Sequence, residues 1–315
     1  MSESSADIPR YVDLQVNGYA GVDFNNSDLT NEDFHFVCRK LRDDNVDQVL
    51  AAVITDDTTN MATRIANIVQ ARESDELVQS VIAGIHIEGP FLNPADGTIG
   101  AHPKQFVRAP DLDAMKLLLD ASEGLTRLVT IAPEIMGGLA LTRFLVDQGV
   151  VVSAGHCDPT RGELSAAIDE GLSMFTHLGN GCALHLDRHD NIIQRVLSLS
   201  DRIWCCFIAD GIHVPPFALA NYLKIVGMER AIVVSDAMAA ARLGPGRYRL
   251  GSIDVVVDDQ KRALLADGDG RLAGSVATMP DLQAVLNDRV GLADRDIERL
   301  LITNPKSILA PIHRP

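Results

Sequence analysis

The stretch Ile85-His86-Ile87-Glu88-Gly89-Pro90 ends an apolar run on a carboxylate, followed by two residues that break regular structure. It predicts a strand that delivers Glu88 at its carboxyl end. Because the carboxyl ends of parallel barrel strands open onto one face, side chains from several such ends should meet in one pocket. Four later apolar runs end similarly: VVVSAGH on His156, SMFTH on His177, CCFIADGIH on Asp210 and His213, and AIVVSD on Asp236.

Eight apolar runs of strand length alternate with segments of helical spacing, such as Asn31–Arg42 and Asp111–Leu119. Eight is the strand number of a (β/α)8 barrel, and 315 residues suit one barrel with a small addition. The predicted strands are Tyr11–Asn17, Asp47–Thr55, Val81–Glu88, Thr126–Pro133, Gly149–His156, Ser173–His177, Arg202–Asp210 and Arg230–Asp236.

The pattern changes after the eighth run. Leu243–Gly274 alternates short β-prone pieces with Gly and Asp-Gly, which predicts two or three antiparallel strands. Met279–Asn287 and Asp294–Leu301 then return to helical spacing. The sequence therefore predicts a TIM-like α/β barrel over 11–242 and 275–310, with a small residual β appendage over 243–274.

Composition limits the classes of partner. The formal net charge of -15 disfavours nucleic acid and anionic membranes, and no apolar run approaches the ~20 residues of a membrane span. The first ten residues, MSESSADIPR, lack the features of a secretory or transit signal. The five cysteines are odd in number and lack CxxC spacing, which is typical of reduced thiols in a cytoplasmic protein.

Glu88, His156 and His177 are the predicted metal ligands. One carboxylate with two imidazoles leaves a divalent ion an open position, as in catalytic zinc sites. Iron, cobalt and manganese fit the same donor set. The alternative for each histidine is a structural role at a strand end, fixed by hydrogen bonds.

Asp236 follows its apolar run directly, so its carboxylate could move a proton to and from water in the pocket. The alternative is an N-cap for a following helix. His213 could polarise a substrate carbonyl, and its alternative is a loop histidine fixed by Asp210. Several groups in the predicted pocket loops could hold a phosphate, and the alternative for each is an ordinary position on the surface. They are His102, Arg108, Asn180, Gly181, His185, Arg188 and His189.

These motifs resemble the N-acetylglucosamine-6-phosphate deacetylase family of the amidohydrolase superfamily. The similarity runs through YVDLQVNGYAGVDFN, HIEGPFLNP, GAHPKQFVR, VVSAGH, FTHLGN, ADGIHV, VVSDA, LAGSVATM and TNPKSIL, nearly the whole chain from Tyr11. The resemblance implies a metal-dependent barrel that hydrolyses the acetamide of an amino-sugar phosphate. It also implies roles: Glu88, His156 and His177 as ligands, Asp236 as general acid/base, and His213, His102, Asn180 and Gly181 at the substrate. Arg188 matches an arginine that contacts the phosphate from a neighbouring subunit, which implies a homodimer.

Three departures from the family pattern stand out. Gln15 and Asn17 occupy the place of the HxH pair of two-metal amidohydrolases, so one divalent ion per chain is expected. The family's N-terminal β segment and last strands have no counterpart, which leaves Leu243–Gly274 of its small β domain. The loop HLGNGCALHLDRHDN stands where the family has HLYNAMP or HLFNAMP.

These observations leave three functions open. The first is hydrolysis of N-acetylglucosamine-6-phosphate to glucosamine-6-phosphate and acetate. The second is the same amide hydrolysis on a different N-acyl substrate, motivated by the changed loop. The third is a barrel that binds a sugar phosphate without turnover, motivated by the reduced β domain.

Overall fold

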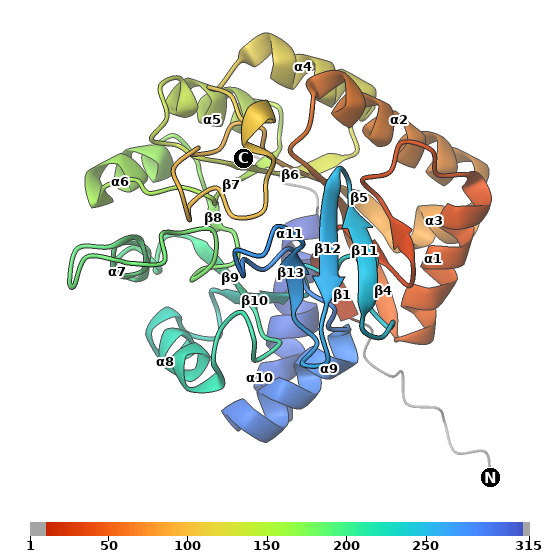
Figure 1. The fold of residues 1–315 in the computed structure, drawn as a ribbon. Coiled ribbons are helices and arrows are strands. Elements are labelled where there is room, and N and C mark those ends of the chain that lie inside the picture. The colour runs from red at the N-terminus through yellow and green to blue at the C-terminus, as the bar shows by residue number, and fades with distance from the viewer. Residues whose placement is uncertain (1–10, 311–315) are drawn as a thin grey trace.

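The computed structural model describes residues 11–310, so the signal-free amino terminus inferred from MSESSADIPR lies outside the described residues. Eight parallel strands pair in chain order, and a bridge between Val16 and Ala237 joins the first to the last. This arrangement confirms the predicted barrel (Figure 1). Its strands are β1 (Tyr11–Val16), β4 (Val46–Ile54), β5 (Ile82–Glu88), β6 (Thr126–Ile131), β7 (Val151–Ala154), β8 (Met174–Phe175), β9 (Trp204–Ile208) and β10 (Ala231–Val234).

Helices surround the barrel in Figure 1. Helix α1 buries Phe34, Val37, Cys38 and Leu41 on one face, as its spacing predicted. The predicted helix Asp111–Leu119 begins one residue later, because the Asp111 carboxylate caps the free N–H groups of its first turn. The helices are α1 (Asn31–Asp43), α2 (Thr58–Ser74), α3 (Glu76–Val81), α4 (Leu112–Ala121), α5 (Gly138–Asp147), α6 (Arg161–Asp169), α7 (Ile192–Leu197), α8 (Pro216–Val226), α9 (Met279–Val285), α10 (Asp294–Glu298) and α11 (Asn304–Leu309).

Short irregular turns complete the helical regions: a 3₁₀ turn at Lys104–Phe106 and π turns at Leu286–Val290 and Arg299–Thr303. None of the helices described in residues 11–310 has both the length and the hydropathy to cross a membrane.

Three sets of buried side chains make the core, and one of them packs the small sheet against the barrel through residues such as Ile54, Met238 and Leu250. Of the other two sets, one faces the helices, and one fills the barrel interior with residues such as Leu14, Leu50, Leu128, Met174 and Ile232. Buried polar side chains of the strands replace this apolar filling near the carboxyl ends, and they include Gln15, His86, Glu88, Thr130 and Ser153. The change from apolar to polar filling marks the end of the barrel that carries the site.

The small antiparallel sheet consists of β11 (Gly246–Leu250), β12 (Ile253–Val257) and β13 (Ala263–Leu265). It lies in front of the barrel strands in Figure 1. The short hairpin of β2 (Gly18–Tyr19) and β3 (Val22–Asp23) touches it, since the Gly251 N–H donates to Asp23 Oδ2 at 2.6 Å. The small sheet is therefore tied to the end of the barrel that holds the polar residues.

Several strands end earlier than the sequence suggested. His156, His177 and Asp236 have φ angles of 49°, 32° and 51°, in the left-handed region. That conformation turns the backbone out of the sheet and costs a non-glycine residue about 1–3 kcal/mol. Strands β7, β8 and β10 consequently stop at Ala154, Phe175 and Val234.

Candidate active site

A cavity of about 430 Å³ opens at the carboxyl ends of the barrel strands. Its base is lined by Glu88, His156, His177, His213 and Asp236, so the predicted convergence of these side chains occurs. Its walls include Leu250, Leu272 and Arg271 of the small sheet and its last turn, together with Leu184, Leu186 and Ile193 near α7. The candidate catalytic groups thus gather at the base of a cavity whose walls are largely apolar apart from Arg271 and Asn180.

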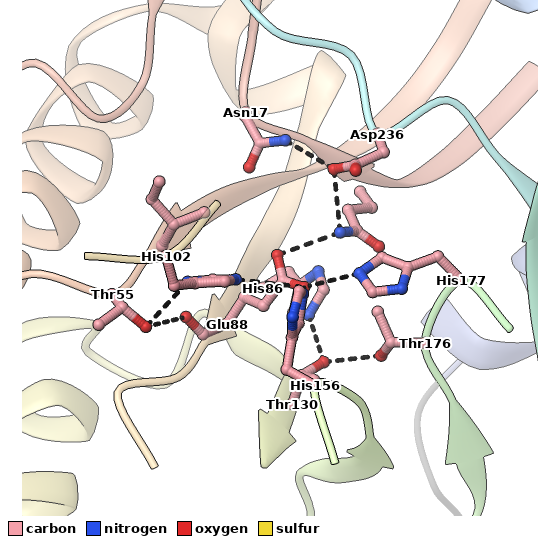
Figure 2. Close-up of polar contacts among 12 residues, drawn as sticks. Asn17, Thr55, His86, Glu88, His102, Thr130, His156, Thr176, His177 and Asp236 are labelled. Carbon is pink, nitrogen blue, oxygen red and sulfur yellow. Dashed lines mark hydrogen bonds and ion pairs between the residues drawn. The ribbon is translucent and has the colours of Figure 1, made fainter. Parts of the chain in front are cut away.

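Glu88, His156 and His177 form one compact donor cluster. Glu88 Oε1 lies 3.3 Å from His156 Nε2 and 3.1 Å from His177 Nε2. One donor atom from each of the three residues lies within 4.8 Å of the others, and all three residues are buried. Figure 2 shows both rings directed at the carboxylate. A carboxylate oxygen and two imidazole nitrogens at this spacing could hold a divalent ion with a position left open.

The hydrogen bond of His156 tests whether the cluster suits a cation. His156 Nδ1 lies 2.9 Å from the Thr98 carbonyl oxygen, which can only accept, so Nδ1 carries a hydrogen. In the neutral ring the lone pair of Nε2 then points at Glu88 Oε1. Two acceptors that face each other repel unless a proton or a metal ion lies between them, and this tautomer is the one that metal ligands use. The donor set therefore fits a divalent ion.

Electrostatics in the cluster favour an ionised Glu88. Burial raises the pKa of its carboxyl, but contacts with His156 and His177 outweigh that effect and hold the pKa well below its usual range. Burial lowers the pKa of His177, and the hydrogen bond to Glu88 outweighs it, so the net pKa is raised. His177 Nδ1 is buried without a hydrogen-bond partner in residues 11–310. A buried carboxylate anion with imidazole nitrogens beside it favours a bound cation, which would neutralise the buried charge.

The ring of His156 sits in a slot between two glycines. A Cβ atom at Gly100 would lie 2.8 Å from the ring, and one at Gly181 also 2.8 Å. Both glycines have φ near +60°, a conformation that side chains rarely adopt. Gly181, predicted at the substrate, therefore contacts a candidate ligand directly. Asn180 lines the cavity beside it, and its Nδ2 donates to the His177 carbonyl at 3.3 Å.

Asp236 is held from one side by two amides of strand β1 and its extension. Asn17 Nδ2 donates to Asp236 Oδ1 at 2.7 Å, and Gln15 Nε2 donates to the same oxygen at 3.0 Å. Gln15 Nε2 also donates to Glu88 Oε2 at 3.1 Å, so one amide joins the two carboxylates. No described residue donates to Asp236 Oδ2, which leaves that oxygen for proton transfer. The N-cap alternative does not hold, since no helix begins after Asp236 before α9.

Burial raises the pKa of Asp236 to about 6, and the charge of Glu88 adds to the rise. A carboxyl that titrates near neutral pH can both accept and return a proton. His213 lies across the cavity, with Nδ1 2.6 Å from Asp210 Oδ2. Burial raises the pKa of Asp210, but the His213 hydrogen bond outweighs it and the net pKa is lowered. His213 is therefore both fixed by Asp210, as its alternative proposed, and exposed to the cavity.

His102 lies deeper than the exposed phosphate candidates with which the sequence grouped it. Its Nε2 is 3.9 Å from Glu88 Oε1, and its ring meets His156 edge-on with centroids 4.4 Å apart. His102 Nδ1 contacts Thr55 Oγ1 at 3.0 Å (Figure 2). Burial, followed by the charge of His156, lowers the pKa of His102 to about 3. It is a neutral ring at the base of the cavity.

The basic side chains predicted to hold a phosphate, from Arg108 and from the loop 185–189, do not line the cavity. Arg188 is exposed and does not line it, and the same holds for His185 and His189. Arg108 is exposed and pairs with Asp111 at 2.7 Å. Of the phosphate candidates, His102, Asn180 and Gly181 line the cavity, while the four exposed residues do not.

No contact within the site was predicted from the sequence for four residues that contribute to it: Gln15, Asn17, Thr98 and Arg271. Gln15 and Asn17 occupy alternate positions at the end of the first strand, a place that could have signalled inward-facing side chains. Thr98 acts through a backbone carbonyl, which no side-chain pattern reveals. Arg271 arrives from the small sheet, and sequence spacing does not predict how that sheet docks.

Known proteins resemble this chain over most of its length. N-acetylglucosamine-6-phosphate deacetylase of Bacillus subtilis is 32% identical over 274 residues, which is 86% of this chain and 67% of that protein. N-acetylgalactosamine-6-phosphate deacetylase of Shewanella is 31% identical over 272 residues, 86% of this chain and 66% of that one. The chain thus spans about two thirds of the curated relatives that it matches. No protein-family model matches it.

Solved structures agree with these relatives. The N-acetyl-D-glucosamine-6-phosphate deacetylase of Mycobacterium smegmatis, a mutant in complex with N-acetyl-D-glucosamine-6-phosphate, superposes with a TM-score of 0.87 at 32% identity. The match covers 96% of this chain and 77% of that one. The corresponding enzyme of Thermotoga maritima gives a TM-score of 0.84 at 25% identity, over 96% of this chain and 78% of that one. The similarity in structure therefore extends over nearly the whole chain.

Proposed function

Because this chain belongs to the N-acetylglucosamine-6-phosphate deacetylase family, we propose that it hydrolyses the N-acetyl amide of an amino-sugar phosphate. The products would be acetate and glucosamine-6-phosphate when N-acetylglucosamine-6-phosphate is the substrate. The observation that carries the proposal is that Asp236, Glu88, His156 and His177 line the base of one cavity. A proton-transfer group and a cation site thus face the same small volume.

Glu88, His156 and His177 would hold one divalent ion, and Gln15 and Asn17 supply no imidazole for a second. When bound, such an ion supplies Lewis-acid chemistry at an acyl carbonyl and favours deprotonation of water at neutral pH. We favour zinc, and iron, cobalt and manganese suit the same donors. The hydrogen bond from His156 Nδ1 to Thr98 holds the ring in its ligand tautomer.

Asp236 is the proposed general acid/base. Its Oδ1 is saturated by the amides of Gln15 and Asn17, so Oδ2 takes the proton of the attacking water. Oδ2 then returns that proton to the nitrogen as the amide C–N bond breaks. Attack forms a new C–O bond at the acyl carbon, and the amine leaves neutral, so atoms and charge balance.

His213 and His102 are the proposed substrate-orienting rings. Asp210 fixes His213 Nδ1, which leaves Nε2 for a group of the sugar. His102 lies beside the cluster and lines the same cavity, where it would orient the acyl group of the substrate. Asn180 and Gly181 form the neighbouring wall, where they would face the acetamide.

Arg188 is the proposed phosphate contact, and we propose that it acts across a homodimer. The support is its exposure at the far end of a loop whose earlier residues line the cavity while Arg188 itself does not, together with the family match. An arginine on such a loop can reach an anion in a second copy. We further propose a cytoplasmic location and no nucleic-acid or membrane partner, in line with the formal net charge of -15.

The direct experiment measures acetate release from the phosphorylated and unphosphorylated forms of N-acetylglucosamine and N-acetylgalactosamine. We expect the 6-phosphates to be preferred, and the epimer comparison identifies the sugar. Hydrolysis of another N-acyl compound in place of all four would support the second function, motivated by Gly179 and Gly181 of the changed loop. Binding of a sugar phosphate without acetate release would support the non-catalytic barrel.

A further inference from the structure

Segment 98–102 is a thin wall between two cavities. Ala101 and His102 line both the active-site cavity and a second cavity of about 380 Å³ on the other side. Thr98, Ile99 and His102 are buried, but Gly100 has no side chain and Ala101 borders both cavities, so packing holds the middle of the segment weakly. The wall nevertheless positions His156, because Thr98 accepts its Nδ1 hydrogen bond and Gly100 abuts its ring.

Arg271 braces this wall from the small sheet. Its Nη1 donates to the Gly100 carbonyl at 2.7 Å. Its Nε contacts Asp269, and its Nη2 donates to Asp267 Oδ2 at 3.2 Å. The two carboxylates aim the planar guanidinium at the wall, and a charged donor makes the bond to Gly100 stronger than a neutral one.

The position of Arg271 is itself fixed. The Leu265 N–H donates to the Arg271 carbonyl at 2.9 Å, which pairs this segment with β13. Four residues further on, the Ser275 N–H donates to the Asp236 carbonyl at 2.8 Å. The segment 271–275 therefore connects the wall behind His156 to the loop that carries Asp236.

Arg271 is the only arginine or lysine that lines the active-site cavity within residues 11–310. It could be taken for an anion ligand on that ground. Two carboxylates already offset its positive charge and, with the Gly100 carbonyl, take three of its five N–H donors, so an incoming phosphate would meet the repulsion of Asp267 and Asp269. The contacts favour a bracing role over anion binding.

We propose that Arg271 is a positioning residue for the metal ligand His156, acting through Gly100 and the wall 98–102. The inference rests on the metal centre of the proposed function. Loss of the guanidinium frees the Gly100 carbonyl, lets the wall move toward either cavity, and loosens the slot and the Thr98 hydrogen bond that orient the ring. Mutation of a residue that orients a metal ligand typically lowers metal affinity by about 10–100-fold.

The test is the Zn²⁺ affinity of the full chain, stripped of metal and titrated against a chromophoric chelator. Arg271→Ala should weaken the affinity about tenfold, the lower end of that range, because it acts one contact further out. Arg271→Lys should lose less, since an ammonium can still donate to Gly100 but cannot also span both carboxylates. Arg262→Ala is the matched control, because Arg262 pairs with Asp258 in the same sheet and does not line the cavity. It should stay within about twofold.

The outcomes are separable. Affinity within about twofold of the unmodified chain in Arg271→Ala overturns the inference, as does an equal loss in Arg262→Ala. If Arg271→Ala does not fold, Arg271→Lys and Asp269→Asn decide, and both should bind Zn²⁺ measurably more weakly. An unmodified chain that binds no divalent ion contradicts the proposed metal centre itself.

Discussion

Replacing Asp236 with Asn should abolish most turnover while leaving the site assembled. The Asn carbonyl can take the place of Oδ1 and keep the hydrogen bonds from Gln15 and Asn17. What is lost is the proton acceptor at Oδ2, and general acid/base steps are typically worth about 10²–10⁴-fold. We therefore expect kcat to fall by about that factor with metal content unchanged.

The same change should stabilise the metal-free protein at alkaline pH. The pKa of Asp236 is raised to about 6 by burial and by Glu88, above the value near 3.8 expected in the unfolded chain. A raised pKa contributes stability below pH ~4 that is lost as pH rises through ~6. The loss is on the order of 3 kcal/mol for a shift of about two units in this fully buried group. Asn cannot ionise, so Asp236→Asn should unfold at higher denaturant concentration than the unmodified chain at pH 8.

Asp23 offers a matched control. Burial also raises its pKa to about 6, yet it does not line the cavity. Asp23→Asn should share the changed pH dependence of stability and keep kcat, with a lower stability at all pH values because an amide cannot accept from both Asn25 and Gly251. Acetate release, metal analysis and chemical denaturation at pH 5 and pH 8 measure all three quantities. Retention of more than about a tenth of kcat in metal-loaded Asp236→Asn would refute its assignment as the proton-transfer group.

Three further outcomes are expected. Glu88→Gln should weaken divalent-metal affinity more than Arg271→Ala does, because an amide is a poorer ligand than a carboxylate; unchanged occupancy would remove Glu88 from the ligand set. Arg188→Ala should raise KM for the 6-phosphate far more than for the unphosphorylated sugar, and an equal rise on both would separate this loop from the phosphate. Burial raises the pKa of Asp13 to about 7, so stability should fall as pH rises from 5 to 8, and less steeply in metal-free Asp13→Asn.

The barrel was predictable because its strands are buried on both faces. Runs such as AIVVS lack alternation, which is typical of parallel strands covered by helices, and the structure contains a strand at each of the eight predicted places. The ends were less predictable. His156, His177 and Asp236 adopt left-handed backbone conformations that turn out of the sheet, and propensity favours neither histidine nor aspartate enough there to signal it.

The cluster at Glu88 was predictable for a different reason: strand ends of a barrel converge whatever the loops do. Residues that reach the site from loops were not. His102 was expected to contact a phosphate, but it lies beside Glu88. Arg188 does not line the cavity. Loop paths depend on tertiary contacts, which the sequence pattern does not reveal. Gln15 was noted only for the imidazole it lacks, yet its amide joins Glu88 to Asp236.

The central claim is that one divalent ion held by Glu88, His156 and His177 makes this cavity a deacetylase. Its most direct test measures metal equivalents per chain and acetate release from N-acetylglucosamine-6-phosphate on the same samples, during stepwise removal and restoration of Zn²⁺. We predict that activity rises in proportion to occupancy and saturates at one ion per chain, and that Glu88→Gln fails to follow this relation. Full acetate release from metal-stripped protein, or saturation only at two ions per chain, would contradict it.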